Sequence, residues 1–149
     1  MFELIATLTI TASSALLFAY WFRYTCVLIL KAKPTRDFAG EVAAANQLSF
    51  VEVQSRLRTA SADLAPLHQA LDRDYALVTY LVRHAGGHQG DISLEDRMLQ
   101  LNYRAMRAFY RVSRPFSAAA ARKALEEMSL VVEHFANVMG ERALAGAAA

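Results

Sequence analysis

The chain begins with a long apolar stretch that ends in a cluster of aromatic side chains. Residues Leu4 to Phe22 contain no charged side chain, and as a helix they would extend about 28 Å, close to the thickness of the hydrocarbon core of a bilayer. The aromatic residues at the end of this run, which include Trp21 and Tyr24, are typical of a membrane interface. The pattern predicts a transmembrane anchor with a juxtamembrane extension over residues 1–33.

The charges around the apolar stretch distinguish an anchor from a cleaved signal peptide. A signal peptide carries positive charge before its apolar run and small residues at a cleavage site after it. Here only Glu3 precedes the run, whereas Arg23, Lys31, Lys33 and Arg36 follow it. Because Lys and Arg accumulate on the cytoplasmic side, we expect an uncleaved anchor in the inner (cytoplasmic) membrane, with the N-terminus outside and the C-terminal domain in the cytoplasm.

The anchor carries two sets of candidate contact residues. Small residues recur every four positions, a spacing that lets a second transmembrane helix approach closely. This packing face consists of Thr7, Thr11, Ser14, Ala15 and Ala19. The residues expected at the membrane interface are Trp21, Arg23, Tyr24, Lys31 and Lys33. The predicted partners are the lipid bilayer and another transmembrane helix, from a second copy or a partner subunit. The alternative is that such small residues are simply common in transmembrane helices.

Residues 34–48 are predicted to form a connection that holds a short helix. Asp37 is placed to cap a helix over about 37–45. Ser49 and Glu52 then form the pattern of a capping box, which indicates the start of a second short helix that ends near residue 58.

Three longer helices are predicted from start and stop signals farther along the chain. The first begins after Asp63 and ends at Gly86–Gly87, the second opens at Ser93 and ends at Pro115, and the third is capped by Ser117. Apolar residues at steps of three and four are expected in the core: Leu64, Leu67, Leu71, Tyr75, Val78, Val82, Leu125, Met128, Val132, Phe135 and Met139.

No stretch of the sequence alternates cleanly with a period of two, so no strand is predicted. The fold class is therefore all-α, with a single N-terminal transmembrane helix followed by a small cytoplasmic helical bundle. We expect the bundle domain over residues 49–144 and a frayed tail over residues 145–149.

The helix after Ser93 presents a stripe of arginines within a strip about 100° wide. This basic stripe consists of Arg97, Arg104, Arg107, Arg111 and Arg114. An adjacent apolar face is expected to lie in the core, and consists of Leu94, Met98, Leu101, Ala105, Phe109 and Val112. On the far side, Tyr103, Met106 and Tyr110 belong fully to neither face. The stripe would suit an anionic lipid or an acidic protein surface, and the alternative is a solvated face.

Composition argues against several classes of function. The formal net charge of +2 and the lack of a reader motif argue against a nucleic-acid-binding protein. Cys26 is the only cysteine, which excludes an internal disulfide and a cysteine-based zinc site. His84 and His88 flank two glycines without a well-spaced third ligand, and no nucleophile–base set is apparent. We expect no catalytic residue, no metal site and no cofactor. The scarcity of Lys relative to Arg, with abundant Ala, favours a bacterial origin.

The sequence therefore predicts a bitopic membrane protein that acts by protein–protein contact, as an adaptor, scaffold or accessory subunit of a membrane complex. The alternative is a membrane-tethered ligand-binding or sensory domain, in which the helices hold a small molecule between them. The candidate polar residues for such a pocket are Tyr75, Tyr80, His134 and Asn137.

Overall fold

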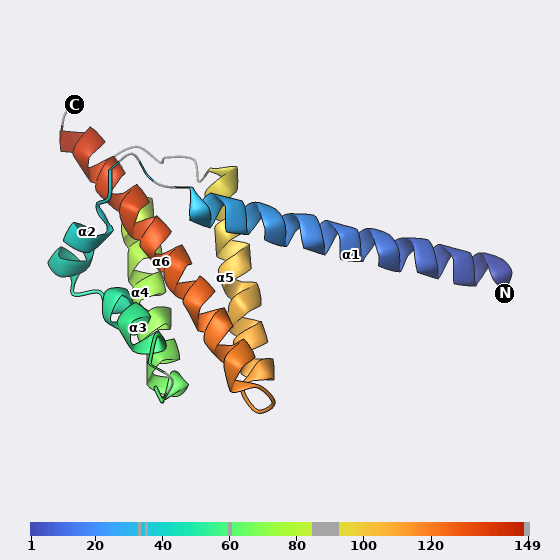
Figure 1. Cartoon of the computed structure of the whole chain (residues 1–149). Coiled ribbons are helices and arrows are strands. Elements are labelled where there is room, and N and C mark those ends of the chain that lie inside the picture. Colours follow the sequence, from blue (N-terminus) through green and yellow to red (C-terminus); the bar gives the residue numbers. More distant parts are fainter. Residues whose placement is uncertain (33, 35, 60, 85–92, 148–149) are drawn as a thin grey trace. The chain divides into compact units, whose positions relative to one another are not determined.

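The computed structural model describes residues 1–149 except 33, 35, 60, 85–92, 148 and 149. The described residues form six helices and no strand (Figure 1), which confirms the predicted all-α class. The chain divides into two compact units, Met1–Ala32 and Lys33–Ala149. The first unit holds a single helix, and the second is a helical domain.

Helix α1 covers Phe2–Lys31 without interruption. It is long and apolar enough to cross a membrane, and none of its most apolar window is buried. The helix ends where Ala32 adopts an extended conformation, two residues before Pro34. The predicted helical anchor segment is thus one continuous helix.

Helix α2, Ala39–Asn46, is fixed to α6, Ala118–Ala147, at its first turn. The Asp37 carboxylate accepts a hydrogen bond from the Ala39 N–H at 3.0 Å, but the N-cap residue is Phe38, so the helix begins later than the predicted cap at Asp37 implied. The Phe38 N–H donates to the Asn137 side chain at 2.8 Å. The Phe38 ring lies against Gly140, where a Cβ atom would overlap it. Glycine at position 140 therefore permits the close approach of α2 to α6.

Helix α3, Phe50–Leu57, is not started by the predicted capping box. The Ser49 side chain makes no capping bond; instead its hydroxyl accepts from Arg73 at 2.7 Å. The Ser49 N–H donates to the buried Asp74 carboxylate at 2.6 Å. A carboxylate from α4, Leu64–His84, thus accepts the Ser49 N–H in place of Glu52, to which the capping box assigns this role.

Helix α6 runs through the middle of the helical domain and packs against α2, α3, α4 and α5, the last covering Leu94–Ser113 (Figure 1). Start signals are confirmed at both α5 and α6, where the Ser93 and Ser117 hydroxyls accept from backbone N–H groups three residues later. Helix α6 continues through Ala147, beyond the point where we expected fraying.

Most of the predicted core is confirmed. Its fully buried or nearly buried members are Leu67, Leu71, Val78, Val82, Leu125, Met128, Val132 and Phe135. The remaining three expected core residues, Leu64, Tyr75 and Met139, are half-buried. Polar contacts tie the short helices to this core, because Arg122 donates to the carbonyl groups of Leu57 and Thr59 at the end of α3.

Candidate functional site

The apolar face of α5 is exposed, so the prediction that it forms part of the core was wrong. The exposed large apolar side chains on this face range from 47% exposed at Phe109 to 86% at Phe116, which lies just beyond the helix. We call this surface the apolar stripe; it consists of Leu94, Leu101, Ala105, Ala108, Phe109, Val112 and Phe116. Met98 shares the same side of the helix and is half-buried.

A more polar face of α5 packs into the domain instead. Its buried residues are Asp96, Leu99, Asn102, Tyr103, Tyr110 and Ser113. Three of these polar side chains, those of Asp96, Asn102 and Tyr103, find partners on other helices, which makes their burial tolerable. Asn102 donates to the Glu127 carboxylate of α6 at 2.7 Å, and Tyr103 donates to the Asp72 carboxylate of α4 at 3.1 Å. The two tyrosines that we had placed on neither face, Tyr103 and Tyr110, are in fact core residues.

The predicted basic stripe does not act as one surface. Arg107 is drawn toward α4, where its guanidinium group lies 2.9 Å from the Asp72 carboxylate. The other four arginines, Arg97, Arg104, Arg111 and Arg114, are exposed. Between Arg97 and Phe116 the sequence has no acidic residue, so the exposed arginines have no partner within their own helix. By helical spacing, Arg97, Arg104 and Arg111 lie along one edge of the apolar stripe and give that edge a positive charge.

Helices α4 and α5 both pack on α6, and side chains rather than backbone bridge the space between them. The His68 and Tyr110 rings stack with centroids 4.5 Å apart, Asp72 pairs with Arg107, and the Tyr75 and Tyr103 rings stack at 3.7 Å. As the residue number rises along α4 it falls along α5, so the helices run antiparallel. We call this series of pairs the side-chain ladder.

Asp72 is the central acceptor of the side-chain ladder. Its carboxylate accepts a hydrogen bond from the Tyr103 hydroxyl and forms an ion pair with the Arg107 guanidinium group. It also lies 3.7 Å from a ring nitrogen of His68. The pKa of His68 is lowered, and burial is the main cause. The negative charge of Asp72 raises this pKa, whereas the arginine charges of α5 lower it further. His68 is therefore neutral at pH 7. Asp72 and Asp74 both hold helices together, because Asp72 accepts from Tyr103 of α5 and Asp74 accepts from the Ser49 N–H at the start of α3.

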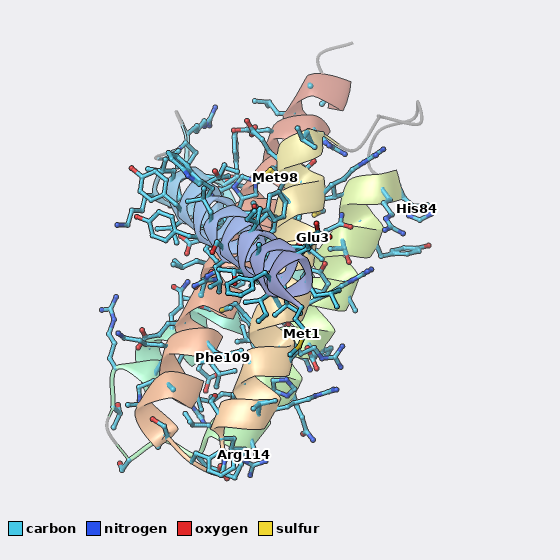
Figure 2. The ribbon with its side chains drawn as sticks, turned by 90° about the vertical axis from the view of Figure 1, so that its right-hand side faces the viewer. Met1, Glu3, His84, Met98, Phe109 and Arg114 are labelled. Carbon is cyan, nitrogen blue, oxygen red and sulfur yellow. The ribbon has the colours of Figure 1, made fainter. Side chains whose placement is uncertain are left out.

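A groove of about 550 Å³ opens between α4 and α5 next to the last pair of the side-chain ladder. Its lining residues are Asp72, Tyr75, Ala76, Thr79, Tyr80, Arg83, His84, Gln100, Tyr103, Arg104 and Arg107. Figure 2 shows His84 near the end of α4. Tyr75 and Tyr80, which we named as candidate pocket residues, line this groove. Sequence reasoning missed Arg83 and Gln100, because only the pairing of the two helices brings them together.

The other two candidate pocket residues, His134 and Asn137, serve different contacts. Asn137 accepts the Phe38 N–H, and His134 lies 3.8 Å from the Asp96 carboxylate. Arg142 also contacts Asp96 at 3.3 Å and donates to the Val82 carbonyl at 2.9 Å. Burial alone would raise the pKa of Asp96, but hydrogen bonds with His134 and Ser93 and the charge of Arg142 together lower it. This cluster joins the ends of α4, α5 and α6.

In α1, the expected packing-face residues lie on the exposed part of the helix. The hydroxyls of Thr7 and Thr11 each donate to the carbonyl group four residues earlier at 2.8 Å. Their protons are thus satisfied within α1, and contact with a second helix would depend mainly on shape. Of the expected interface residues, Trp21, Arg23, Tyr24 and Lys31 belong to α1, and Lys33 lies outside the described residues, as does His88.

Comparisons with protein-family models, with curated proteins and with solved structures find no match to this chain.

Proposed function

We propose that this chain is a single-span membrane protein whose helical domain binds a partner protein through the apolar stripe of α5. It would serve as an adaptor, scaffold or accessory subunit of a membrane complex. The observation that carries this proposal is the exposure of Leu101, Val112 and Phe116, at 56%, 67% and 86%, in one row with Leu94 and Phe109. Contiguous exposed apolar surface of this kind marks interaction sites, whereas isolated apolar residues are ordinary.

The spacing of the stripe suits a helical partner. Positions 94, 98, 101, 105, 108 and 112 are all apolar and follow alternating steps of four and three, as in the seam of a coiled coil. Ala105 and Ala108, in the middle of this row, leave room for another helix to approach. Large residues toward both ends would then pack around it.

The flanking charges favour a partner with acidic residues over a second copy of this chain. Arg97, Arg104 and Arg111 lie beside the apolar stripe, and no acidic residue occurs from position 97 to position 116. Pairing α5 with α5 of a second copy would bring arginines together along one seam, which is unfavourable. A partner helix with an apolar row and acidic flanks meets both requirements.

The anchor supports a partner at the membrane. Seven residues separate the end of α1 from the start of α2, and an extended chain of that length spans at most about 25 Å. With α1 in a bilayer, the domain would remain near the membrane surface, so its partner would be a membrane protein or bound to one. The positive residues after the apolar stretch favour a cytoplasmic domain in the inner membrane.

Co-purification from native membranes tests the proposal. We expect the Leu101→Ser/Val112→Ser double variant to lose its partner in mild detergent, because both changes remove apolar surface without touching the core. Val51→Ser/Leu77→Ser is the matched control, since Val51 and Leu77 are also exposed but lie on α3 and α4. Retention of the partner by the α5 variant, or equal loss in the control, would refute the proposal.

A further inference from the structure

The groove between α4 and α5 lies against the last two pairs of the side-chain ladder and extends past its end. The ladder runs from His68–Tyr110 through Asp72–Arg107 to Tyr75–Tyr103. In the same antiparallel register, the next facing residues are Thr79 and Gln100. The Thr79 hydroxyl donates to the Tyr75 carbonyl of its own helix at 2.6 Å, so its proton is satisfied within α4. Both residues line the groove. No such pair joins the two helices at Thr79 and Gln100, so the space between the helices is open there.

The groove is positively charged. Arg83 enters from α4, and Arg104 and Arg107 enter from α5, against the single carboxylate of Asp72. That carboxylate is already taken by Arg107 and by the Tyr103 hydroxyl. Two exposed guanidinium groups, those of Arg83 and Arg104, therefore face the groove from opposite helices. Burial raises the pKa of Tyr75 while the charges of Arg104 and Arg83 oppose that rise, in line with two positive groups beside one phenol.

The same groove has an aromatic wall. One face of Tyr75 is covered by Tyr103, and Tyr80 stacks on His84 with centroids 4.1 Å apart. Tyr80 is 59% exposed, so its ring leaves a large apolar surface open beside the arginines. A volume of about 550 Å³ lies within the range of small-molecule sites. Guanidinium groups bind phosphate oxygens through paired hydrogen bonds, and tyrosine rings stack on flat rings.

We propose that the groove between α4 and α5 binds a small phosphorylated ligand with a flat ring, in which Arg83 and Arg104 hold the phosphate and Tyr80 contacts the ring. This site shares Arg104 with the arginine edge of the apolar stripe, but it contains no residue of the stripe and does not depend on the partner protein proposed above. A phosphate group can come from a soluble molecule or from a lipid headgroup. These two sources can be distinguished by the requirement for a flat ring, because the lipid probe used below carries a phosphate but no ring.

Calorimetric titration of the full chain in a neutral detergent tests the assignment. The probes are adenosine monophosphate (ring and phosphate), adenosine (ring alone), inorganic phosphate (phosphate alone) and a short-chain phosphatidic acid (lipid phosphate without a ring). We expect adenosine monophosphate to bind at least tenfold more tightly than each of the other three. Binding no tighter than inorganic phosphate, or weaker than phosphatidic acid, would overturn the ring assignment.

Two variants test the residues. Arg83→Gln/Arg104→Gln should weaken binding of adenosine monophosphate at least tenfold, and Tyr80→Ala should reduce its affinity toward that of inorganic phosphate. The matched control is Arg56→Gln/Lys123→Gln, which removes the same charge from exposed positions outside the groove and should bind like the wild type. Circular dichroism checks that each variant is folded. Folded arginine variants that bind like the wild type, or a control that loses binding equally, would overturn the site.

Discussion

The Tyr103 hydroxyl of α5 donates a hydrogen bond to the Asp72 carboxylate of α4 at 3.1 Å, across a space that no backbone contact bridges. Tyr103 is buried and Asp72 is partly exposed at one end of the groove. The pair is therefore one of the side-chain links that join two helices whose backbones do not meet, and both of its residues line the groove.

Removal of this hydroxyl should destabilise the domain modestly. Tyr103→Phe keeps the ring stacked on Tyr75 but loses the bond to Asp72, and we expect the free energy of unfolding to fall by about 1 kcal/mol. Urea unfolding followed by circular dichroism measures it. Tyr80→Phe is the control, because Tyr80 is exposed and should change little. Equal stability of Tyr103→Phe and the wild type would show that the bond contributes nothing.

The buried cap of α3 should matter more than the residue pattern suggests. Asp74→Ala removes the acceptor of the Ser49 N–H and should cost about 1–3 kcal/mol of unfolding free energy. Glu52→Gln should change it by less than about 0.5 kcal/mol, because Glu52 only pairs with Arg56 on the surface. Chemical denaturation of both variants compares them. A larger loss for Glu52→Gln than for Asp74→Ala would restore the capping box that the sequence suggested.

Gly140 should tolerate no side chain while Phe38 lies against it. Gly140→Ala places a Cβ atom against the Phe38 ring, and we expect a loss of about 1–3 kcal/mol of unfolding free energy. A double-mutant cycle measures the coupling, because the same change in a Phe38→Ala background should cost much less. Gly40→Ala serves as the control, since its Cβ would meet open space. Purely additive losses at positions 38 and 140 would contradict this contact.

His68 should make the domain less stable in mild acid. Its folded pKa is lowered, chiefly by burial, whereas in the unfolded chain it is about 6.5. Below about pH 6.5 the unfolded chain takes up the proton more readily, so this contribution is full above that pH and is lost as the pH falls through it. Unfolding free energies at pH 7.5 and 5.5 should therefore differ less for His68→Gln than for the wild type. His84→Gln, a change at an exposed histidine, should leave the wild-type difference intact. The same pH dependence in His68→Gln and the wild type would exclude this role.

Helix boundaries followed from local signals, whereas the orientation of α5 did not. Ser93 and Ser117 cap the helices that they were expected to start, because a cap depends on atoms a few residues away. The core face of α5 depends instead on distant partners. Asn102 and Tyr103 can be buried because the Glu127 and Asp72 carboxylates accept their hydrogen bonds. The periodicity of α5 does not reveal those carboxylates, which lie on other helices.

The same contrast between local signals and distant partners holds for the candidate sites. The basic stripe could be predicted from helical spacing, but the sequence could not show that Arg107 leaves it for Asp72. The groove required the register between α4 and α5, which is set by the stacking of Tyr75 on Tyr103. Tyr75 and Tyr80 were recognised as polar aromatic residues on one helix, whereas the facing arginine, Arg104, was assigned to a surface.

Site-directed photocrosslinking in native membranes tests the role of the apolar stripe most directly. A photoreactive amino acid is placed in turn at each exposed position of α5 from 94 to 112. We expect positions 94, 101, 105, 108, 109 and 112 to crosslink to one partner protein, whereas 97, 104 and 111, at the arginine edge, should crosslink more weakly. Crosslinks only to lipid, only to a second copy of this chain, or without this periodicity would contradict the proposed role.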